Sequence, residues 1–374
     1  MHYRRFGKTE LSVPVFTLGT MRFASAADAR AVITTAIARG ITHLETAAAY
    51  GPSETYIGQV LQTLPMSTRR QLIITSKLTP TLKRHQVLPA LAASLSRLGL
   101  THLDCLAIHG INTAEHLDWF QREMQPAVEA ARADGLIKHL GFSTHGPLSV
   151  ITAAIATSAF SFVNLHYNFF LQRNASAIAQ AHMQDMGIFI ISPADKAGML
   201  YTPPGKLKTL CAPYEPLLLN YRWLLSDPRI STLSIGPAIP TELDWPLQVA
   251  DDTGPLSDDE QRCIERLNRA QIETLGSDRC AQCHQCLPCP ESINIPEVLR
   301  LRNLTIAYDM QHFGQYRYGM FENAGHWFPG RRGDRCTDCG DCLPRCPEQL
   351  DIPALLRDTH QRLKGKSRRR LWGD

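Results

Sequence analysis

Eight of the eleven cysteines in this chain fall between residues 280 and 346, where they form two short runs. The first run reads CAQCHQCLPCP and the second reads CTDCGDCLPRCP. The cysteines are Cys280, Cys283, Cys286 and Cys289 in the first run, and Cys336, Cys339, Cys342 and Cys346 in the second. Clustered thiols can bind metal or form disulfides, and their spacing helps to distinguish these uses.

The spacing of both runs favours iron–sulfur clusters. The second run follows the C-x2-C-x2-C-x3-C-P pattern of bacterial ferredoxins, and the first has one residue fewer before its last cysteine. Zinc is the main alternative, but zinc ribbons use separated C-x2-C pairs because four ligands must close a tetrahedron. A disulfide framework suits small secreted domains, and nothing else here indicates secretion. We therefore expect the eight thiols to hold two [4Fe–4S] clusters.

By analogy with two-cluster ferredoxins, the last cysteine of each run is expected to bind the cluster of the other run. The first cluster would then be held by Cys280, Cys283, Cys286 and Cys346, and the second by Cys336, Cys339, Cys342 and Cys289. The segments that follow the two runs, ESINIPEVLR and EQLDIPALLR, are alike, which supports an internal two-fold repeat. The remaining cysteines, Cys105, Cys211 and Cys263, are expected to pack in apolar surroundings.

The chain before these runs alternates short apolar segments with helix-like stretches, which predicts a (β/α)8 barrel. Eight segments are strand candidates: 15–20, 41–46, 72–77, 103–109, 139–144, 162–167, 188–192 and 232–236. The stretches between them include 26–40, 53–64, 82–100, 114–135 and 174–187, which carry apolar residues at three- and four-residue spacing. The strands are continuously apolar, as in a parallel sheet covered on its faces. An open doubly wound sheet would usually have fewer strands, and no G-x-G-x-x-G follows the first one.

Four polar residues stand at the ends of neighbouring predicted strands. Glu45 and Tyr50 follow the second strand, Lys77 ends the third and His109 ends the fourth. Chemistry in such barrels is built at the carboxyl ends of the strands, so these side chains should meet at one mouth. An ammonium lowers the pKa of a neighbouring phenol, and a carboxylate keeps a partly buried lysine charged. The group therefore suits proton transfer, with the imidazole orienting a substrate oxygen.

The first 250 residues resemble the aldo-keto reductases. The similar segments are MHYRRFGKTELSVPVFTLGTMRF, ETAAAYGPSETYIGQVL, LIITSKL, LAIHGIN and HLGFSTHG. The resemblance implies that Tyr50 is the general acid, that Lys77 lowers its pKa and that His109 orients a carbonyl. Where the family has an aspartate, this chain has Glu45. The cysteine module is similar to a C-terminal extension found on one bacterial branch of the same family.

The resemblance also implies a nicotinamide cofactor, with NADP(H) expected and NAD(H) or a flavin as alternatives. The positions that match the family's cofactor contacts are Gly19, Thr20, Met21, Ser143, Thr144 and Asn164. Ile191 stands at the position of the ring-stacking aromatic. After the last strand, the usual basic contacts to a 2′-phosphate are not evident, and Glu242 falls near one of them. A carboxylate beside a phosphate would be repulsive.

The composition and net charge of the chain limit its expected location and partners. The chain has 374 residues, 44% of them hydrophobic, and a net charge of +4, which is too small to indicate nucleic-acid binding. No run reaches the roughly 18 apolar residues that a membrane helix needs. The first residues, MHYRRFGKTELSVPV, lack the apolar segment of a secretory signal. We expect a cytoplasmic protein that binds neither nucleic acid nor membranes.

These observations predict two domains, a barrel over residues 1–275 and a smaller, mainly helical, ferredoxin-like domain over 276–374. The predicted function is an oxidoreductase that reduces a small carbonyl compound, or oxidises the alcohol, with one-electron transfer through the clusters to a ferredoxin-like partner. The alternative is a redox-sensing or binding subunit with structural or regulatory clusters and low turnover. The two would be distinguished by activity toward aldehydes with and without iron.

Overall fold

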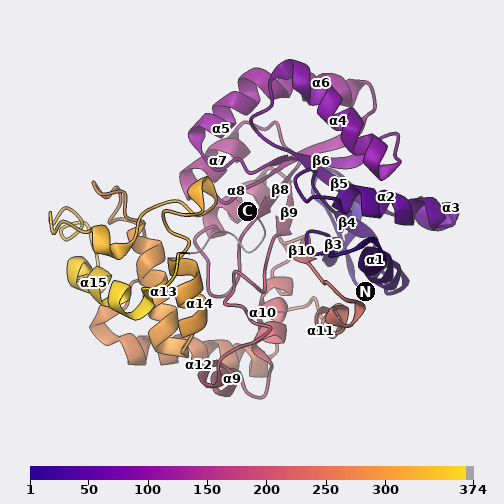
Figure 1. The fold of residues 1–374 in the computed structure, drawn as a ribbon. Helices are drawn as coiled ribbons and strands as arrows, with labels where there is room; N and C mark the ends of the chain where they lie inside the picture. The colour runs from indigo at the N-terminus through magenta and orange to yellow at the C-terminus, as the bar shows by residue number, and fades with distance from the viewer. Residues whose placement is uncertain (368–374) are drawn as a thin grey trace. The chain divides into compact units, whose positions relative to one another are not determined.

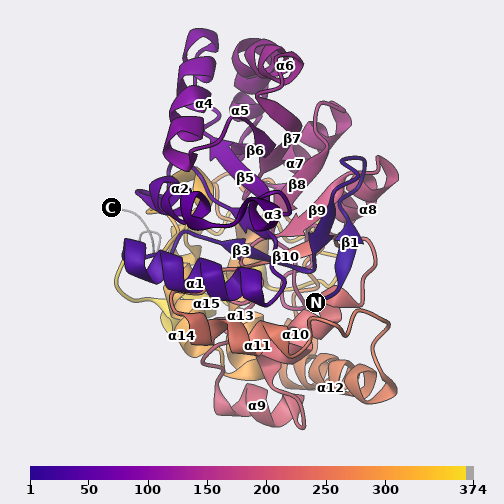
Figure 2. The same ribbon diagram turned by 90° about the vertical axis from the view of Figure 1, so that its right-hand side faces the viewer.

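Eight parallel strands close into a barrel in the computed structural model, which describes residues 1–367 (Figures 1 and 2). The order around the barrel is β10-β3-β4-β5-β6-β7-β8-β9, so neighbours in the sequence are neighbours in the sheet. The strands are β3 (Phe16–Gly19), β4 (His43–Glu45), β5 (Ile73–Leu78), β6 (Leu103–His109), β7 (Ile137–Ser143), β8 (Phe162–Leu165), β9 (Gly187–Ile190) and β10 (Thr232–Ile235). Each lies in or overlaps a predicted strand, and the predicted barrel is confirmed.

A short antiparallel hairpin precedes the barrel and was not predicted. It consists of β1 (Tyr3–Arg5) and β2 (Ser12–Pro14). Phe6, in its turn, is fully buried against Phe162 and Phe189, with 5.2 Å between the ring centroids of Phe6 and Phe162. Phe162 begins β8, so the hairpin packs against the end of the barrel at which the strands begin. The carboxyl ends of the strands remain for the chemistry.

Helices surround the strands (Figures 1 and 2). They are α1 (Ala26–Ala38), α2 (Ser53–Thr63), α3 (Met66–Arg69), α4 (Arg84–Leu98), α5 (Ala114–Trp119), a π-helical turn η1 (Phe120–Met124), α6 (Gln125–Ala133), α7 (Leu148–Ala156), α8 (Ala175–Met183), α10 (Pro216–Leu225), a 3-10 turn η2 (Pro240–Leu243) and α11 (Asp244–Leu247). Local signals fix several ends. Ser25 caps α1 by accepting from the Asp28 N–H, and Gly99 ends α4 at a φ of 63°.

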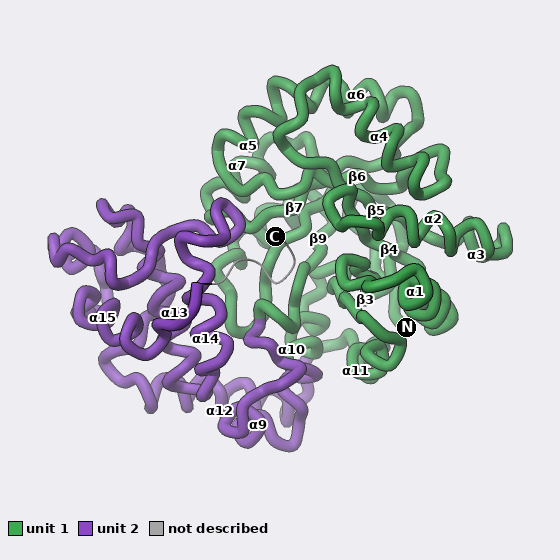
Figure 3. Tube along the Cα trace, viewed as in Figure 1, with its two compact units in different colours: residues 1–196, 220–255 green, residues 197–219, 256–374 purple. Residues whose placement is uncertain are grey.

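The chain divides into two compact units, and the division differs from the predicted boundary near residue 276. Unit 1 comprises Met1–Lys196 and Asn220–Pro255, and unit 2 comprises Ala197–Leu219 and the chain from Leu256 onward (Figure 3). Its elements are α9 (Gly205–Cys211), α12 (Asp258–Leu275), η3 (Gly276–Asp278), α13 (Ile295–Tyr308), α14 (Gln311–Tyr318), η4 (Gly325–Trp327), η5 (Gly333–Arg335) and α15 (Ile352–Leu363).

Packing explains why α12 goes with the second unit. The Cys263 thiol on α12 donates to the Cys211 carbonyl of α9 at 3.3 Å, and the Tyr308 hydroxyl of α13 donates to the Leu267 carbonyl at 3.0 Å. The buried face of α12 is therefore covered by segments on both sides of it in the sequence. In the described part of the chain, no helix is both long and apolar enough to cross a membrane.

The barrel interior contains a neutral histidine, which should make the stability of the folded protein fall at low pH. His43 is fully buried, with Nδ1 2.8 Å from Thr17 Oγ1 and Nε2 2.7 Å from Thr75 Oγ1. Burial lowers its pKa to about 3, with nearby Asp104 opposing and Lys77 adding to the effect. Because the unfolded chain binds a proton near pH 6.5 and the folded one does not, stability is full above pH 6.5 and falls as pH drops toward 3.

We expect the free energy of unfolding to fall by about 2 kcal/mol between pH 7.5 and pH 5 through this group alone. In His43→Gln that part of the pH dependence should disappear. Urea unfolding followed by circular dichroism at the two pH values measures it. The same substitution at the exposed His85 is the control, and equal pH dependence in wild type and His43→Gln would contradict the assignment.

Candidate active site and cluster sites

The register of the barrel strands brings the predicted strand-end residues onto adjacent positions. Gly19 pairs with Glu45 across β3 and β4, and His109 pairs with Ser143 across β6 and β7. Ser143 pairs in turn with Asn164 across β7 and β8. Residues separated by up to 145 positions in the sequence thus line one end of the barrel.

Lys77 lies between Glu45 and Tyr50. Its Nζ donates to the Tyr50 hydroxyl at 3.0 Å and to the Thr46 carbonyl at 2.9 Å, and it forms an ion pair with Glu45 Oε1. Nζ also lies 4.4 Å from the centre of the Tyr50 ring. The side chains of Lys77 and Glu45 are only 2% and 5% exposed, whereas Tyr50 is half-buried. The phenol is therefore the member of this group that reaches toward the mouth.

The Lys77 ammonium is held in its charged form. Burial alone would lower its pKa, but the charges and hydrogen bonds of Glu45 and Tyr50 outweigh burial, and the pKa is raised above its ordinary value. A buried ammonium needs such a counter-charge, which Glu45 supplies. At neutral pH, Lys77 therefore presents a fixed positive charge to the Tyr50 oxygen.

His109 completes the predicted group. It ends β6, its ring centroid lies 5.5 Å from that of Tyr50, and the two rings meet edge-on at 84°. His109 is 8% exposed. The structure thus brings all four predicted catalytic residues together.

Asn164 links this group to the predicted cofactor side. Its Nδ2 donates to Glu45 Oε1 at 3.4 Å, so the longer acid at position 45 contacts both Lys77 and Asn164. The other end of the amide, Oδ1, is buried and has no hydrogen-bond partner among the described residues. A carboxamide N–H of a nicotinamide would satisfy this oxygen, so the site fits the implied cofactor.

The other predicted cofactor contacts surround the same end of the barrel. The Thr20 hydroxyl donates to the Glu45 carbonyl at 3.0 Å and the Thr144 hydroxyl to the Ile111 carbonyl at 2.7 Å. Ser143 Oγ accepts from the Gly110 N–H at 3.0 Å and keeps its own hydrogen to donate. Met21 is partly exposed beside Thr20. An added Cβ at Gly19 would lie 2.8 Å from Ser234 Oγ, so a side chain there would have to displace the Ser234 hydroxyl.

The Glu242 carboxylate is paired with a cation, the Arg22 guanidinium. Arg22 Nη1 donates to Glu242 Oε2 at 2.7 Å and Nη2 to Oε1 at 3.3 Å. The Ala238 N–H also donates to Glu242 Oε2, at 2.8 Å. The repulsion expected between Glu242 and a phosphate is thereby reduced, and Arg22 brings a positive charge that the sequence did not connect with this loop.

A pair of histidines at the same end was missed by sequence reasoning. His166 Nε2 lies 3.1 Å from His145 Nδ1, and His166 Nδ1 lies 3.0 Å from the Ile191 carbonyl. Because a carbonyl only accepts, His166 Nδ1 must carry a hydrogen. His166 falls within the predicted strand 162–167, two residues after Asn164, so alternation could have indicated it, whereas His145 lies in the loop beyond the end of β7.

The backbone of the second unit confirms the internal repeat. Residues at corresponding places in the two cysteine loops adopt the same left-handed conformation: Gln282 and Asp338 at φ 59° and 57°, His284 and Gly340 at 63° and 81°, and Ser292 and Gln349 at 56° and 51°. Asn294 caps α13 and Asp351 caps α15 in the same way, each accepting from a backbone N–H three residues on. The two halves are therefore built alike.

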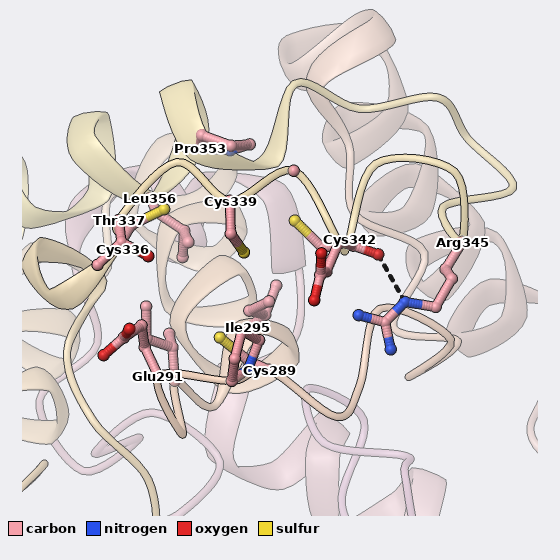
Figure 4. Close-up of a pocket in the computed structure, with 14 residues that line it drawn as sticks. Cys289, Glu291, Ile295, Cys336, Thr337, Cys339, Cys342, Arg345, Pro353 and Leu356 are labelled. Atoms are coloured by element: carbon pink, nitrogen blue, oxygen red, sulfur yellow. Dashed lines mark hydrogen bonds between the residues drawn. The ribbon is translucent and has the colours of Figure 1, made fainter.

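Four of the predicted cluster ligands line one cavity (Figure 4). They are Cys289 from the first run and Cys336, Cys339 and Cys342 from the second. The cavity measures about 330 Å³, part of it open to solvent, and Ile293, Ile295 and Leu356 supply apolar walls. The cysteine predicted to cross from the first run thus lies beside the second run.

The other four predicted ligands also approach one another. Burial is the largest cause that raises the pKa of Cys280, and Cys283 and Cys346 lie close enough to raise this pKa further. Burial, followed by Cys280 and Cys283, raises the pKa of Cys286 to about 12. Four thiolates together would repel unless a cation compensated them, which is what a cluster does. Within residues 1–367, no three His, Cys, Asp or Glu side chains are grouped to hold a single metal ion.

Comparison with protein families places the barrel and the cysteine-rich part of the chain in two different families. Residues 16–201 match the aldo/keto reductase family, and residues 279–350 match the 4Fe-4S dicluster domain. The chain therefore contains an aldo/keto reductase domain, followed by a C-terminal 4Fe-4S dicluster domain.

Known proteins resemble the barrel portion. The NAD(P)H-dependent 6'-deoxychalcone synthase of Glycine max is 40% identical over 102 residues, which is 26% of this chain and 32% of that protein. Aldo-keto reductase AKR2E4 of Bombyx mori is 29% identical over 198 residues, 48% of this chain and 62% of that protein. The chain thus spans about a third of the first relative and just under two thirds of the second.

Among solved structures, the holo form of aldo-keto reductase AKR11C1 from Bacillus halodurans superposes with a TM-score of 0.62. It is 20% identical, and the match covers 71% of this chain and 96% of that one. At this identity the likeness shows the fold.

Proposed function

We propose that this protein is an oxidoreductase that interconverts a small carbonyl compound and its alcohol with a nicotinamide cofactor. The observation that carries the proposal is the position of Lys77, buried between Glu45 and the Tyr50 hydroxyl. An ammonium 3.0 Å from a phenol oxygen favours the phenolate, so it makes the phenol a better proton donor. A residue of this kind typically contributes 10²- to 10⁴-fold to a rate.

Each residue of the group has a distinct role in the proposal. Tyr50 gives its proton to the carbonyl oxygen in reduction, and takes it back in oxidation. Lys77 stabilises the phenolate that remains, and Glu45 keeps Lys77 charged. His109, beside the Tyr50 ring, orients the carbonyl by donating to its oxygen. When bound, the reduced nicotinamide supplies the hydride.

Asn164 and Ser143 are proposed to hold the nicotinamide carboxamide, with Gly19, Thr20, Met21 and Thr144 around it. Asn164 Oδ1 would accept one hydrogen, and the Ser143 hydroxyl can donate another. NADP(H) is the proposed cofactor, and the name of the Glycine max relative, NAD(P)H-dependent, is consistent with it. NAD(H), which has no 2′-phosphate, is the alternative because the Arg22 guanidinium is already paired with the Glu242 carboxylate.

The eight cysteines are proposed to hold two [4Fe–4S] clusters in the crossed arrangement, which would carry single electrons to or from a ferredoxin-like partner. Clustering of Cys289 with the second run supports this arrangement. A chain of this kind would combine hydride chemistry in unit 1 with one-electron chemistry in unit 2.

Anaerobically purified protein tests both halves of the proposal. We expect about eight iron and eight sulfide ions per chain. We also expect oxidation of NADPH, or of NADH, when a panel of small aldehydes and ketones is added. Zinc in place of iron would overturn the cluster half, and no turnover with any cofactor and carbonyl pair would overturn the barrel half.

A further inference from the structure

The two cysteine loops share a backbone but differ at one side chain beside a ligand sulfur. Gln282 follows Cys280 by two residues, and Asp338 follows Cys336 by two residues. Their φ angles are 59° and 57°, and the backbone N–H of each donates to the sulfur two residues before it. Main-chain hydrogen bonds to these two sulfurs are therefore matched, and the difference lies in the side chains.

The Gln282 amide is fixed as a donor to the Cys280 sulfur. Its Nε2 lies 3.3 Å from Cys280 Sγ and 2.9 Å from the carbonyl oxygen of Pro296, in the first turn of α13. Each hydrogen of the NH2 group thus has an acceptor, and the contact with α13 holds the amide against the sulfur. This hydrogen bond persists when the thiol loses its proton, because the amide supplies the hydrogen.

Asp338 cannot make the equivalent interaction. The Cys336 thiol lies 3.8 Å from Asp338 Oδ1, with the thiol as donor. Once Cys336 is a thiolate no hydrogen remains between sulfur and oxygen, because a carboxylate only accepts. Arg357 Nη1 instead pairs with Asp338 Oδ1 at 2.5 Å. This pair is exposed, at 56% and 60%, so its charges are screened by solvent.

Other charges near the second cavity offset one another. Glu291, Asp341 and Arg345 line it, and Glu291 lies 3.5 Å from Arg331. The Arg345 guanidinium donates to the carbonyl oxygens of Asp341 at 2.7 Å and Pro288 at 3.0 Å, rather than to sulfur. The direct amide-to-sulfur contact at Cys280 is therefore the clearest asymmetry between the halves.

We propose that Gln282 makes the two cluster sites inequivalent and holds the reduction potential of the Cys280 site above that of the Cys336 site. This inference rests on the proposed presence of two clusters. A hydrogen bond to a ligand sulfur stabilises the reduced, more negative state, and a nearby carboxylate destabilises it. The Cys280 site is therefore reduced first. Gln282 acts as a positioning residue that tunes its neighbour without binding metal itself.

A redox titration followed by electron paramagnetic resonance, with dithionite as reductant, tests this in the intact protein. Wild type should show two separate midpoints. Gln282→Met, which removes the donor without adding charge, should lower the upper midpoint and leave the lower one in place. Asp338→Asn, which supplies the missing amide, should raise the lower midpoint. Together the two substitutions should narrow or reverse the gap.

Gln349→Glu is the matched control for charge. Gln349 is exposed, shares the left-handed conformation and lies three residues after Cys346. Among the described residues, the Gln349 side chain makes no hydrogen bond to a cysteine sulfur, so Gln349→Glu should shift the upper midpoint less than Gln282→Glu does. Equal shifts would show a general charge effect and overturn the inference.

The outcomes separate the inference from the proposed function. Iron and sulfide counts well below two clusters would defeat the proposed function. Two clusters with a single common midpoint, or with midpoints that Gln282→Met leaves unchanged, would defeat the inference alone. If Gln282→Met fails to bind iron, Asp338→Asn still decides, because an unchanged lower midpoint there contradicts the role given to this position.

Discussion

Replacement of Tyr50 by phenylalanine should lower kcat for carbonyl reduction by about 10²- to 10⁴-fold. The substitution removes only the hydroxyl that accepts from Lys77 Nζ at 3.0 Å, and the ring can keep its edge-on contact with His109. Substrate binding should change much less than kcat, because the lost interaction forms chiefly in the transition state. The buried Glu45–Lys77 ion pair keeps both its charges, so the barrel should fold normally.

Steady-state kinetics with the best carbonyl and cofactor pair measure this effect, and cofactor binding should be followed separately by fluorescence. Tyr56→Phe, in α2 of the same barrel, is the matched control and should leave kcat within about twofold. If Tyr50→Phe retained most of the activity, Tyr50 could not be the proton donor in carbonyl reduction. Absence of measurable carbonyl reduction in the wild type would instead favour the alternative of a binding subunit with little turnover.

The barrel could be predicted because its signals are local. Each strand is a short apolar run and each helix a periodic one, and eight alternations leave few architectures. The four catalytic candidates could be predicted because parallel strands end at the same side of the sheet. The same principle extends to His145 and His166, two residues beyond Ser143 and Asn164, where loop positions hid the alternation. The α7 segment, LSVITAAIA, has only Ser149 and Thr152 as polar positions, too few to reveal helical periodicity.

Features that depend on tertiary packing were not available from the sequence. Residues 197–219 join the second unit although barrel segments flank them on both sides, because Cys211 packs against Cys263 of α12. The Arg22–Glu242 pair joins residues 220 positions apart, and nothing in either local sequence indicates it. Cysteine spacing indicated clusters, but the hydrogen bond from Gln282 to Cys280 required the position of α13.

Loss of one cluster is expected to disorder the cysteine loops while the barrel stays folded. Residues 336–351 contain no helix or strand, and residues 279–294 contain only an isolated bridge from Ile293 to Arg331. Few backbone hydrogen bonds hold these loops, so their order should come largely from metal ligation. Cys342→Ala should remove about half of the iron and raise the rate of proteolysis of residues 336–351 at least tenfold, about 1.4 kcal/mol of local stability.

The crossed ligand arrangement predicts which cluster is lost when Cys289 is replaced. Although it belongs to the first run, it lines the cavity of the second, so Cys289→Ala should remove the same cluster as Cys342→Ala. The double variant should then lose no more iron than either single one. Uncrossed ligation would instead strip both clusters from the double variant. Cys263→Ala, a buried cysteine of the same unit outside the runs, should keep all its iron. Carbonyl reduction by Cys342→Ala then shows whether the second cluster takes part, because unchanged turnover with half the iron means that the reaction does not need this cluster.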